Sequence, residues 1–532
     1  MFNKSEKYHE EYSAQIVKIG ALEPIENSDF LVKTSINDAY DVVVGKNDVK
    51  EGDIMVYAKL ETQLNLDFLS VNNQFELSER HLNKNYDEVQ KLIDADKQDE
   101  AKKLVGYFNK NGRVRLVRLR GCPSMGCLFT IDSLAKWKPE VKDYDFSQCF
   151  VPNADGIVEP FNFDTIGDDL FIKAYVPKVQ EPQARKDKAA KRNRKIKRFD
   201  RMIEGQFSFH YDTNMLRENM WRINPTTVVT ISTKLHGTSH IVGNLLVKKP
   251  KNSIGARINI KKKERELKGV LKREKRFYWQ RKVNGDKIRA IKEYINSLHT
   301  VGYGNVCASR TVIKNQYINR GPQRHFYGKD VWGDYGRLLY PYLLKGMTVY
   351  SEICGYVDGT ATPIQKYKKT GQAFDYGCAV GESFIMPYRI TFTDEDGVRT
   401  EWNVMAVYGW TLSLLKDHPE LKGKVRPLDI LYHGTLGDLY PEISVSEHWN
   451  ANVLKAMAND TEHFAMELDE PLCKNKVPRE GIVLRIDDDE KAEAFKLKTL
   501  IFLDKQDRAA MDAGEVDFEM SQGYGENDDF DS

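Results

Sequence analysis

The run Lys234-Leu-His236-Gly237-Thr-Ser239 comes shortly after residues 228–231, which are expected to form a strand. A lysine amine held against the α-phosphorus of a nucleotide can attack it and form a phosphoramidate, a bond labile enough to pass the nucleotide on. The amine must be partly deprotonated, which requires cationic neighbours or a metal. The alternative is a strand end, a solvated lysine and a turn glycine, because a bare K-x-x-G pattern is not specific.

Two carboxylates stand in apolar surroundings further along the chain. Glu352 lies within Tyr-Ser-Glu-Ile-Cys-Gly, and Glu480 enters the apolar run Gly-Ile-Val-Leu. An unpaired charge on an apolar strand is expensive. A ribose hydroxyl or a metal ion would satisfy such a carboxylate, and a buried salt bridge would do so equally well. Gly481, next to Glu480, permits close backbone approach.

Three cations complete the set of candidate residues. Arg310 follows Ser309 in the strand-like stretch 305–313 and could grip a phosphate bidentately, the alternative being a solvated arginine. Lys496 and Lys498 should lie on one face of a strand, because side chains two residues apart share a face. Two like charges side by side are unfavourable unless an anion lies between them. A triphosphate would serve, and so would a pair of carboxylates.

These residues together supply what nucleotidyl transfer requires: a nucleophile, a divalent metal and positive charge on the phosphate oxygens. The sequence contains no GxxxxGK[ST] phosphate loop, no HExxH and no GxSxG motif. Hydrolases and kinases built on those motifs are therefore not indicated.

The elements that position these residues divide the chain into parts. With 532 residues it is too long for one ordinary core. Residues 14–60 show short strands, 84–105 the spacing of a helix, and 113–120 another strand. We expect an α+β protein with an N-terminal OB-type β-barrel followed by an ATP-grasp-like two-sheet nucleotidyltransferase domain. The predicted divisions are an OB module over 1–177, a basic linker over 178–202, a catalytic domain over 203–505 containing a basic insertion at 248–300, and an acidic disordered tail over 506–532.

The composition of the sequence indicates the cellular compartment in which the protein is expected to act. The start of the chain has no apolar core of a signal peptide, and no stretch is long and apolar enough to cross a membrane. Seven cysteines, an odd number, do not form a disulfide framework, and we expect reduced structural thiols. The protein is expected to be a cytoplasmic monomer of a bacterium or a phage-infected cell, with no membrane partner.

The order KxHG, SR, YxExxG, EGxV, KxK resembles the covalent nucleotidyltransferase superfamily of ligases and RNA capping enzymes. The KLHG form is similar to the RNA ligase 2-like branch, whereas DNA ligases and capping enzymes usually carry KxDG. The stretches RVRLVRLRGCPSMGCLF, DTIGDDLFIKAYVPK, RHFYGKDVW, LLKGMTVYSEICGY and PIQKYKKTGQAFDYGC resemble Deinococcus-type RNA ligases, which have an N-terminal OB module. The resemblance covers most of residues 14–504.

The resemblance implies a role for each matching residue. Lys234 would carry AMP, Gly237 would let the backbone approach the nucleotide, and His236 would act near the phosphate. Glu352 would bind the ribose and Glu480 a metal ion. Arg310, Lys496 and Lys498 would bind phosphates. The implied cofactors are ATP and Mg²⁺, with Mn²⁺ as a substitute, and the implied activity joins a 3′-OH to a 5′-phosphate of RNA, in RNA repair, through lysyl-AMP and RNA-adenylate.

Two departures from the family pattern affect the adenine contacts. Relatives often carry an acidic residue before the lysine, where this chain has Thr233. The aromatic that stacks on adenine is expected in FIMPYRITFTD, where Tyr388, Phe384 and Phe392 are candidates and Tyr388 is our choice, against the alternative of a packed strand aromatic. Ser239 replaces a common asparagine.

RNA is the expected partner, as a nicked duplex, a broken tRNA or free ends. Its charge suits the basic segments, which could supply salt-dependent backbone contacts or be solvated arms. The candidate contacts are Arg310, Lys195, Arg198, Lys261 and Lys262. Three other functions remain open: a GTP-using capping-type nucleotidyltransferase, a DNA ligase, and a non-catalytic RNA-binding protein. Label transfer from ATP or GTP, and the requirement for an RNA strand, distinguish them.

Overall fold

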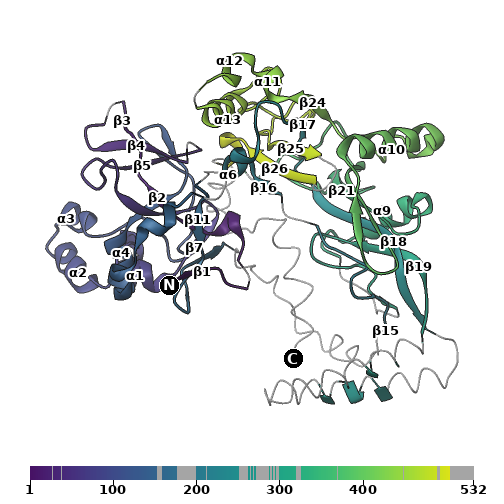
Figure 1. Ribbon diagram of the computed structural model, residues 1–532, viewed down its shortest axis with the longest axis horizontal. Coiled ribbons are helices and arrows are strands. Elements are labelled where there is room, and N and C mark those ends of the chain that lie inside the picture. Colours follow the sequence, from purple (N-terminus) through teal and green to yellow (C-terminus); the bar gives the residue numbers. More distant parts are fainter. Residues whose placement is uncertain are drawn as a thin grey trace.

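The computed structural model describes residues 1–503 apart from residues 7, 27, 38, 153–157, 176–198, 211–212, 251–261, 264, 268, 271–286, 288–289, 292–293, 295–298, 319–324, 368, 447 and 488–491. The chain is a mixed α+β protein, in agreement with the predicted class. The N-terminal part (residues 1–175) and the C-terminal part (residues 199–503) lie on opposite sides of Figure 1, and α6, β16 and β26 face the N-terminal part. Most of the predicted basic linker, most of the basic insertion and the acidic tail lie outside the described residues.

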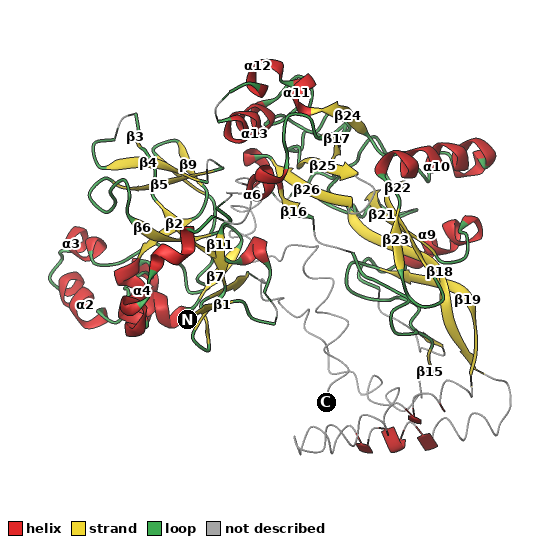
Figure 2. Cartoon of the chain, viewed as in Figure 1, coloured by secondary structure: helices red, strands yellow, loops and turns green. Residues whose placement is uncertain are grey.

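The N-terminal part consists of short strands with helices at one end (Figure 2). Its elements are β1 (Phe2–Asn3), η1 (Glu10–Tyr12), β2 (Ala14–Lys18), β3 (Leu22–Pro24), β4 (Leu31–Ile36), β5 (Tyr40–Gly45), β6 (Ile54–Ala58), β7 (Thr62–Leu64), α1 (Leu66–Val71), η2 (Leu77–Leu82), α2 (Tyr86–Asp94), α3 (Gln98–Lys103), β8 (Val117–Leu119), β9 (Cys122–Ser124), β10 (Cys127–Thr130), α4 (Ile131–Trp137), η3 (Pro139–Asp143), η4 (Phe146–Phe150), β11 (Phe161–Phe163), β12 (Thr165–Ile166), β13 (Asp169–Leu170) and β14 (Ile172–Ala174).

The described strands of this part do not close into a barrel. They pair as the sheets β10-β6-β2-β11, β3-β4-β5 and β1-β12-β13 and as the two-stranded ladders β14-β7 and β8-β9. Strands β5 and β9 do not form a ladder: the backbone N–H of Val43 donates to the Oγ of Ser124, and one backbone hydrogen bond joins the N–H of Met125, directly after β9, to the carbonyl of Asp41. Because a side chain takes the N–H that a neighbouring strand would use, the two sheets stay separate here. The OB-type β-barrel predicted for this part is therefore not confirmed by the pairing of its described strands.

Two sequence-based element predictions were wrong in extent. The single helix expected over 84–105 is broken between α2 and α3, where Asp96 adopts a φ of +59° that a helix cannot accommodate. The strand expected over 113–120 is reduced to β8. Before β8, Val114 exchanges backbone hydrogen bonds with residues 61 and 62, at the start of β7, and Leu116 is buried in the core, so pairing with β7 ends before β8 begins.

The C-terminal part contains two five-stranded sheets, in the orders β16-β26-β25-β17-β24 and β19-β18-β21-β22-β23. Its elements are β15 (Phe199–Asp200), β16 (Asn214–Met215), α6 (Leu216–Asn219), η5 (Met220–Arg222), β17 (Val228–Thr233), β18 (Thr238–Pro250), β19 (His299–Ala308), β20 (Tyr317–Ile318), α9 (Val331–Leu339), η7 (Tyr340–Tyr342), β21 (Met347–Gly355), β22 (Ser383–Thr393), β23 (Arg399–Glu401), α10 (Val404–Asp417), η8 (Pro419–Leu421), β24 (Ile430–Thr435), α11 (Leu436–Leu439), α12 (Pro441–Ser444), α13 (Trp449–Asn459), β25 (Gly481–Asp487) and β26 (Ala492–Lys498).

Each of these sheets is covered by helices on one face. Helices α9 and α10 pack on the second sheet through an apolar cluster that includes Trp332 and Val407. Each of them starts at a capping side chain, Asp330 and Asn403, which accepts a backbone N–H of the first turn. Helices α11 and α13 cover the first sheet (Figure 1). The opposite faces of the two sheets are thus left to line a site between them.

One apolar cluster extends across both parts of the chain. It includes Val17 and Met55 from the N-terminal part and Val229, Leu454 and Phe495 from the C-terminal part. The N-terminal part therefore shares buried surface with the sheet that carries β17, β25 and β26. All seven cysteines are free and five are buried, as expected for structural thiols. Among the described residues, no helix is long and apolar enough to cross a membrane.

Candidate active site

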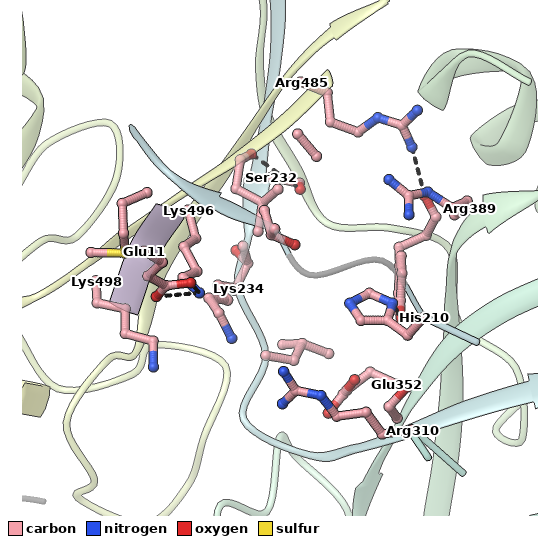
Figure 3. A pocket seen from close by; sticks show the side chains of 18 of the residues that line it. Glu11, His210, Ser232, Lys234, Arg310, Glu352, Arg389, Arg485, Lys496 and Lys498 are labelled. Atoms are coloured by element: carbon pink, nitrogen blue, oxygen red, sulfur yellow. Dashed lines mark hydrogen bonds and ion pairs between the residues drawn. The ribbon is translucent and has the colours of Figure 1, made fainter. Parts of the chain in front are cut away.

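Lys234 lies where the chain passes from one sheet to the other. Strand β17 of the first sheet ends at Thr233, and β18 of the second sheet begins at Thr238. The backbone N–H of Lys234 donates to the carbonyl of Gly481 at 3.0 Å, which continues the pairing of β17 with β25 by one residue. The side chain of Lys234 enters a cavity of about 210 Å³ that is also lined by Glu352, Arg310 and the two lysines of β26 (Figure 3).

Glu480 is the immediate partner of this lysine. Its Oε1 lies 2.6 Å from the Nζ of Lys234 and 3.8 Å from the Nζ of Lys498, and its side chain is 2% exposed. The following residue must be glycine, because φ is +143° at Gly481 and a Cβ there would lie 2.0 Å from the carbonyl of Leu497. The close approach of β25 and β26 thus sets Glu480 beside the two lysines.

The second oxygen of Glu480 fits a divalent cation. It is buried and accepts no hydrogen bond from the described residues, and the Nδ1 of His236 lies 3.6 Å away. No cluster of three or more metal-ligating side chains occurs in the described part of the chain. Mg²⁺ is usually held by one or two carboxylates together with water and substrate phosphates. A single carboxylate with spare lone pairs therefore fits Mg²⁺, and the predicted role of Glu480 is chemically reasonable here.

Gly237 is packed against strand β21. Its backbone N–H donates to the Oε1 of Glu352 at 3.1 Å. A Cβ at this position would lie 2.3 Å from the carbonyl of Ile353, so no larger residue fits without a shift of the backbone. The glycine therefore brings the Lys234 segment against Glu352, the carboxylate that was expected to bind a ribose.

Lys496 and Lys498 point from the same face of β26 into the cavity, as their spacing predicted. Both carboxylate oxygens of Glu11, in η1 of the N-terminal part, contact the Nζ of Lys496, at 2.7 and 2.8 Å (Figure 3). Burial lowers the pKa of Lys496, and repulsion from Lys498 and Lys234 acts in the same direction. Of the two alternatives drawn from the sequence, a carboxylate partner is the one present in this structure.

Arg310 lies near Glu352 at the edge of the cavity (Figure 3). It is in a bend beyond β19, which ends at Ala308, so the strand expected over 305–313 was wrong beyond that residue. Because a strand would alternate its side chains between two faces, this bend is what allows Arg310 to turn toward the cavity.

Of the three aromatic candidates on β22, Tyr388 lines the cavity. Phe384 is buried beneath the guanidinium of Arg426, 3.8 Å from its ring centroid, and Phe392 packs against Trp402. The hydroxyl of Tyr388 is hydrogen-bonded to the Nδ1 of His210 at 2.9 Å. Tyr388 is therefore the candidate whose ring could meet a bound base.

His236 lies behind Lys234 and not among the residues that line the cavity. Its ring makes edge contacts with Phe374 and Phe502, and its backbone N–H donates to the hydroxyl of Tyr376 at 2.6 Å. The Nδ1 of the ring lies 3.6 Å from the carboxylate of Glu480. Ser239, on β18, does line the cavity.

A buried ion pair supports Thr233, the residue before Lys234. The guanidinium of Arg479 contacts Glu470 at 3.0 Å and donates to the Oγ1 of Thr233 at 3.1 Å, and Thr233 also donates to Asp429. Burial raises the pKa of Glu470, which the charge of Arg479 opposes. The hydroxyl of Thr233 is thus fully engaged with protein groups.

Several residues of the cavity were missed in the sequence. No motif marks them, and they come from the N-terminal part, from the loop before β16, from α6 and from inside β22 and β25: Glu11, Lys59, His210, Glu218, Arg389 and Arg485. The predicted RNA contacts are not brought to the cavity, Arg310 apart. Lys262 is exposed in a helical turn, and Lys195, Arg198 and Lys261 lie outside the described residues.

Comparisons with known proteins found matches among solved structures only. No family model and no curated protein matches the chain. The RNA ligase of Naegleria gruberi in complex with PPi is 15% identical, with a TM-score of 0.45, over 93% of this chain and 98% of that chain. A mutant of that ligase with AMP and Mn is also 15% identical, with a TM-score of 0.46, over 92% and 98%. Because both TM-scores lie below 0.5, the function proposed below is based on the site and the motifs.

Proposed function

We propose that this protein is an ATP-dependent RNA ligase of the covalent nucleotidyltransferase superfamily and that Lys234 carries AMP. The observation that supports this most directly is the 2.6 Å contact of Lys234 with the buried Glu480, at a cavity lined by Glu352, Arg310, Lys496 and Lys498. A lysine that served only as a solvated turn residue would not be expected to share a cavity with Glu352, Arg310, Lys496 and Lys498, four of the residues that the motifs single out.

In the first step the unprotonated Nζ of Lys234 attacks the α-phosphorus of ATP. A phosphorus–nitrogen bond forms, the bond from the α-phosphorus to the bridging oxygen breaks, and pyrophosphate leaves. The proton released from the amine passes first to Glu480, the carboxylate in contact with it. The positive charges of Lys496 and Lys498 stabilise the negative charge that develops on the phosphate oxygens.

The remaining residues hold the nucleotide in place. Glu352 accepts a hydrogen bond from a ribose hydroxyl, since an ionised carboxylate is a hydrogen-bond acceptor. The ring of Tyr388 meets the adenine, and the close contact of Gly237 with β21 keeps Lys234 in line with the phosphate. Thr233 makes no adenine contact through its side chain, because its hydroxyl is engaged by Asp429 and Arg479.

When bound, a divalent cation such as Mg²⁺ or Mn²⁺ neutralises charge on the phosphate oxygens and helps to orient them. Glu480 would hold it through the carboxylate oxygen that accepts no hydrogen bond from the residues that the structure describes.

Two further transfers complete the joining reaction. An oxygen of the 5′-phosphate of RNA attacks the α-phosphorus of lysyl-AMP, which breaks the phosphorus–nitrogen bond and gives RNA-adenylate. A 3′-OH then attacks the 5′-phosphate, a phosphodiester forms and AMP leaves. Arg310, at the cavity edge, is placed to contact the 5′-phosphate, because its guanidinium can bind it bidentately.

The division of the chain that was predicted from the sequence gives a role to each of its other parts. We propose that residues 1–177 are an OB-type RNA-binding module, 178–202 a linker, 203–505 the ligase domain and 506–532 a tail, in a monomer that repairs RNA in the cytoplasm. The contact surface of the N-terminal part with β26 favours a direct role of this module at the site.

The test is transfer of label from [α-³²P]ATP to the protein in the presence of Mg²⁺. We expect labelling of the wild type and of Lys422→Ala, in which an exposed lysine away from the cavity is removed, and none of Lys234→Ala. Label on Lys234→Ala would contradict the assignment of the nucleophile.

Three outcomes would move the protein to another class. Label from GTP alone would indicate a capping-type nucleotidyltransferase. Joining of strands whose 3′-OH end is DNA as readily as RNA would indicate a DNA ligase. Absence of label from either nucleotide, with RNA still bound, would indicate a non-catalytic RNA-binding protein.

A further inference from the structure

Glu11 lies at the place where the proposed function requires a phosphate. Lys496 faces the cavity beside Lys498, and the Nζ of Lys496 is held by both carboxylate oxygens of Glu11. The side chains of Glu11 and Lys496 are 13% and 12% exposed, so little water takes part in the contact. A phosphate at Lys496 would thus meet a carboxylate already in position, and the two negative groups would repel one another.

The charges around this contact favour displacement of Glu11 by a phosphate. Three lysines, Lys234, Lys496 and Lys498, face two carboxylates, Glu480 and Glu11, so one positive charge is in excess. A nucleoside triphosphate brings several negative charges. The positive excess that it meets rises from one charge to two when Glu11 leaves, and Glu11 offsets one of the lysine charges when no nucleotide is present.

The N-terminal part holds Glu11 in this position through a second contact. The Nζ of Lys59 donates to the carbonyl of Glu10 at 2.8 Å and pairs with Glu218 of α6 at 2.9 Å. Lys59 thus ties η1, which contains Glu11, to the C-terminal part. This contact is to the backbone of η1, so the side chain of Glu11 can turn away from Lys496 while η1 stays in place.

We propose that Glu11 is a residue of the nucleotide site: it holds Lys496 in the absence of nucleotide, and the triphosphate of ATP displaces it. This inference rests on the proposed function, because it takes Lys496 as a ligand of the ATP phosphates. The N-terminal part therefore sets the affinity for ATP by competing with it, in addition to any contact with RNA.

The test is calorimetric binding of α,β-methylene-ATP with Mg²⁺, an analogue whose methylene bridge prevents transfer of AMP. Glu11→Gln keeps the size of the side chain and removes its charge. We expect its Kd to be about tenfold lower than that of the wild type, equivalent to about 1.4 kcal/mol. Glu10→Gln, the same change one residue away on η1, is expected to leave the Kd unchanged.

A second comparison separates competition from a general change in structure. In the Lys496→Met background, Glu11→Gln should no longer tighten binding, because the lysine for which the two groups compete is absent. An unchanged or raised Kd for Glu11→Gln alone would overturn the proposal, as would equal tightening in both backgrounds. Wild-type protein that forms lysyl-AMP but fails these comparisons would refute this inference alone, whereas wild type that forms no lysyl-AMP would refute the proposed function as well.

Discussion

Glu480 and Lys234 form a 2.6 Å ion pair in which the carboxylate is 2% exposed and the lysine side chain 18% exposed. The glutamate is fixed by the strands around it, and the lysine is the partner that opens onto the cavity. This asymmetry suits a nucleophile that must leave its partner to reach a substrate.

Glu480→Gln should therefore slow formation of lysyl-AMP while leaving the fold intact, since the side chain keeps its size. Removing one preorganised electrostatic group from an active site typically costs about 10²–10³ in rate, and we expect a loss in this range in a single-turnover labelling assay. Glu493→Gln on β26, whose glutamate pairs with Arg222 away from the cavity, is the control. Equal rates for the two variants would show that Glu480 has no part in the step.

Gly237→Ala should destabilise the protein, because the added Cβ would lie 2.3 Å from the carbonyl of Ile353. Overpacking of this kind costs about 1–3 kcal/mol in the free energy of unfolding. Gly409→Ala is the matched substitution. Gly409 is exposed within α10 with open space around it, and there alanine should stabilise by up to about 1 kcal/mol. Urea denaturation measures both, and effects of the same sign would contradict the packing described at Gly237.

Substitutions of Tyr388 should separate the effect of its ring from that of its hydroxyl. Loss of an aromatic that stacks on a base costs about 1–3 kcal/mol, so Tyr388→Leu should raise the KM for ATP about tenfold or more. Tyr388→Phe keeps the ring, loses the hydrogen bond with His210, and should stay near the wild-type KM. Phe392→Leu on the same strand, which packs against Trp402, should affect stability and not KM. A raised KM for Phe392→Leu alone would reassign the adenine contact.

The stability of the protein should fall in mild acid because of His240. Burial lowers the pKa of His240 from 6.5 to about 4. Between these pH values the unfolded chain binds a proton at this residue and the folded chain does not. The free energy of unfolding should therefore decrease as the pH falls from 6.5 toward 4, by about 3 kcal/mol in total from this residue.

The measurement is the free energy of unfolding as a function of pH for the wild type, His240→Gln and, as a control, His81→Gln at an exposed histidine. The curve of His240→Gln should be flatter than the other two over this window, whatever its absolute stability. Parallel curves for all three would place the acid-sensitive group elsewhere.

The sequence predicted which residues of the site lie together because the geometry of a strand fixes the side on which each side chain points. Glu352, Lys496 and Lys498 each lie on a strand, and Glu480 directly precedes β25, so the side on which each side chain points follows from its place in an alternating or apolar run. Strands β17, β25 and β26 are neighbours in one sheet, and β18, which follows the Lys234 segment, pairs with β21 in the other. These pairings bring the side chains together near Lys234.

What could not be predicted depends on contacts between distant segments. Glu11 belongs to a short 3-10 helix without a motif, and its pairing with Lys496 arises only when the two parts of the chain meet. The break at Asp96 and the bend at Arg310 are single-residue backbone changes inside otherwise regular patterns. Local periodicity carries no signal for either, because the deciding interactions are not local.

The apolar cluster shared by the two parts limits how this protein could be engineered. A chimera that replaced residues 1–175 with a foreign nucleic-acid binding module would remove Val17 and Met55 from a core that also contains Val229 and Phe495. It would expose to water the part of this shared core that the N-terminal part covers. A replacement would have to reproduce the buried apolar surface of residues 1–175. A change of the nucleic-acid binding module therefore also affects the stability of the domain that carries the site.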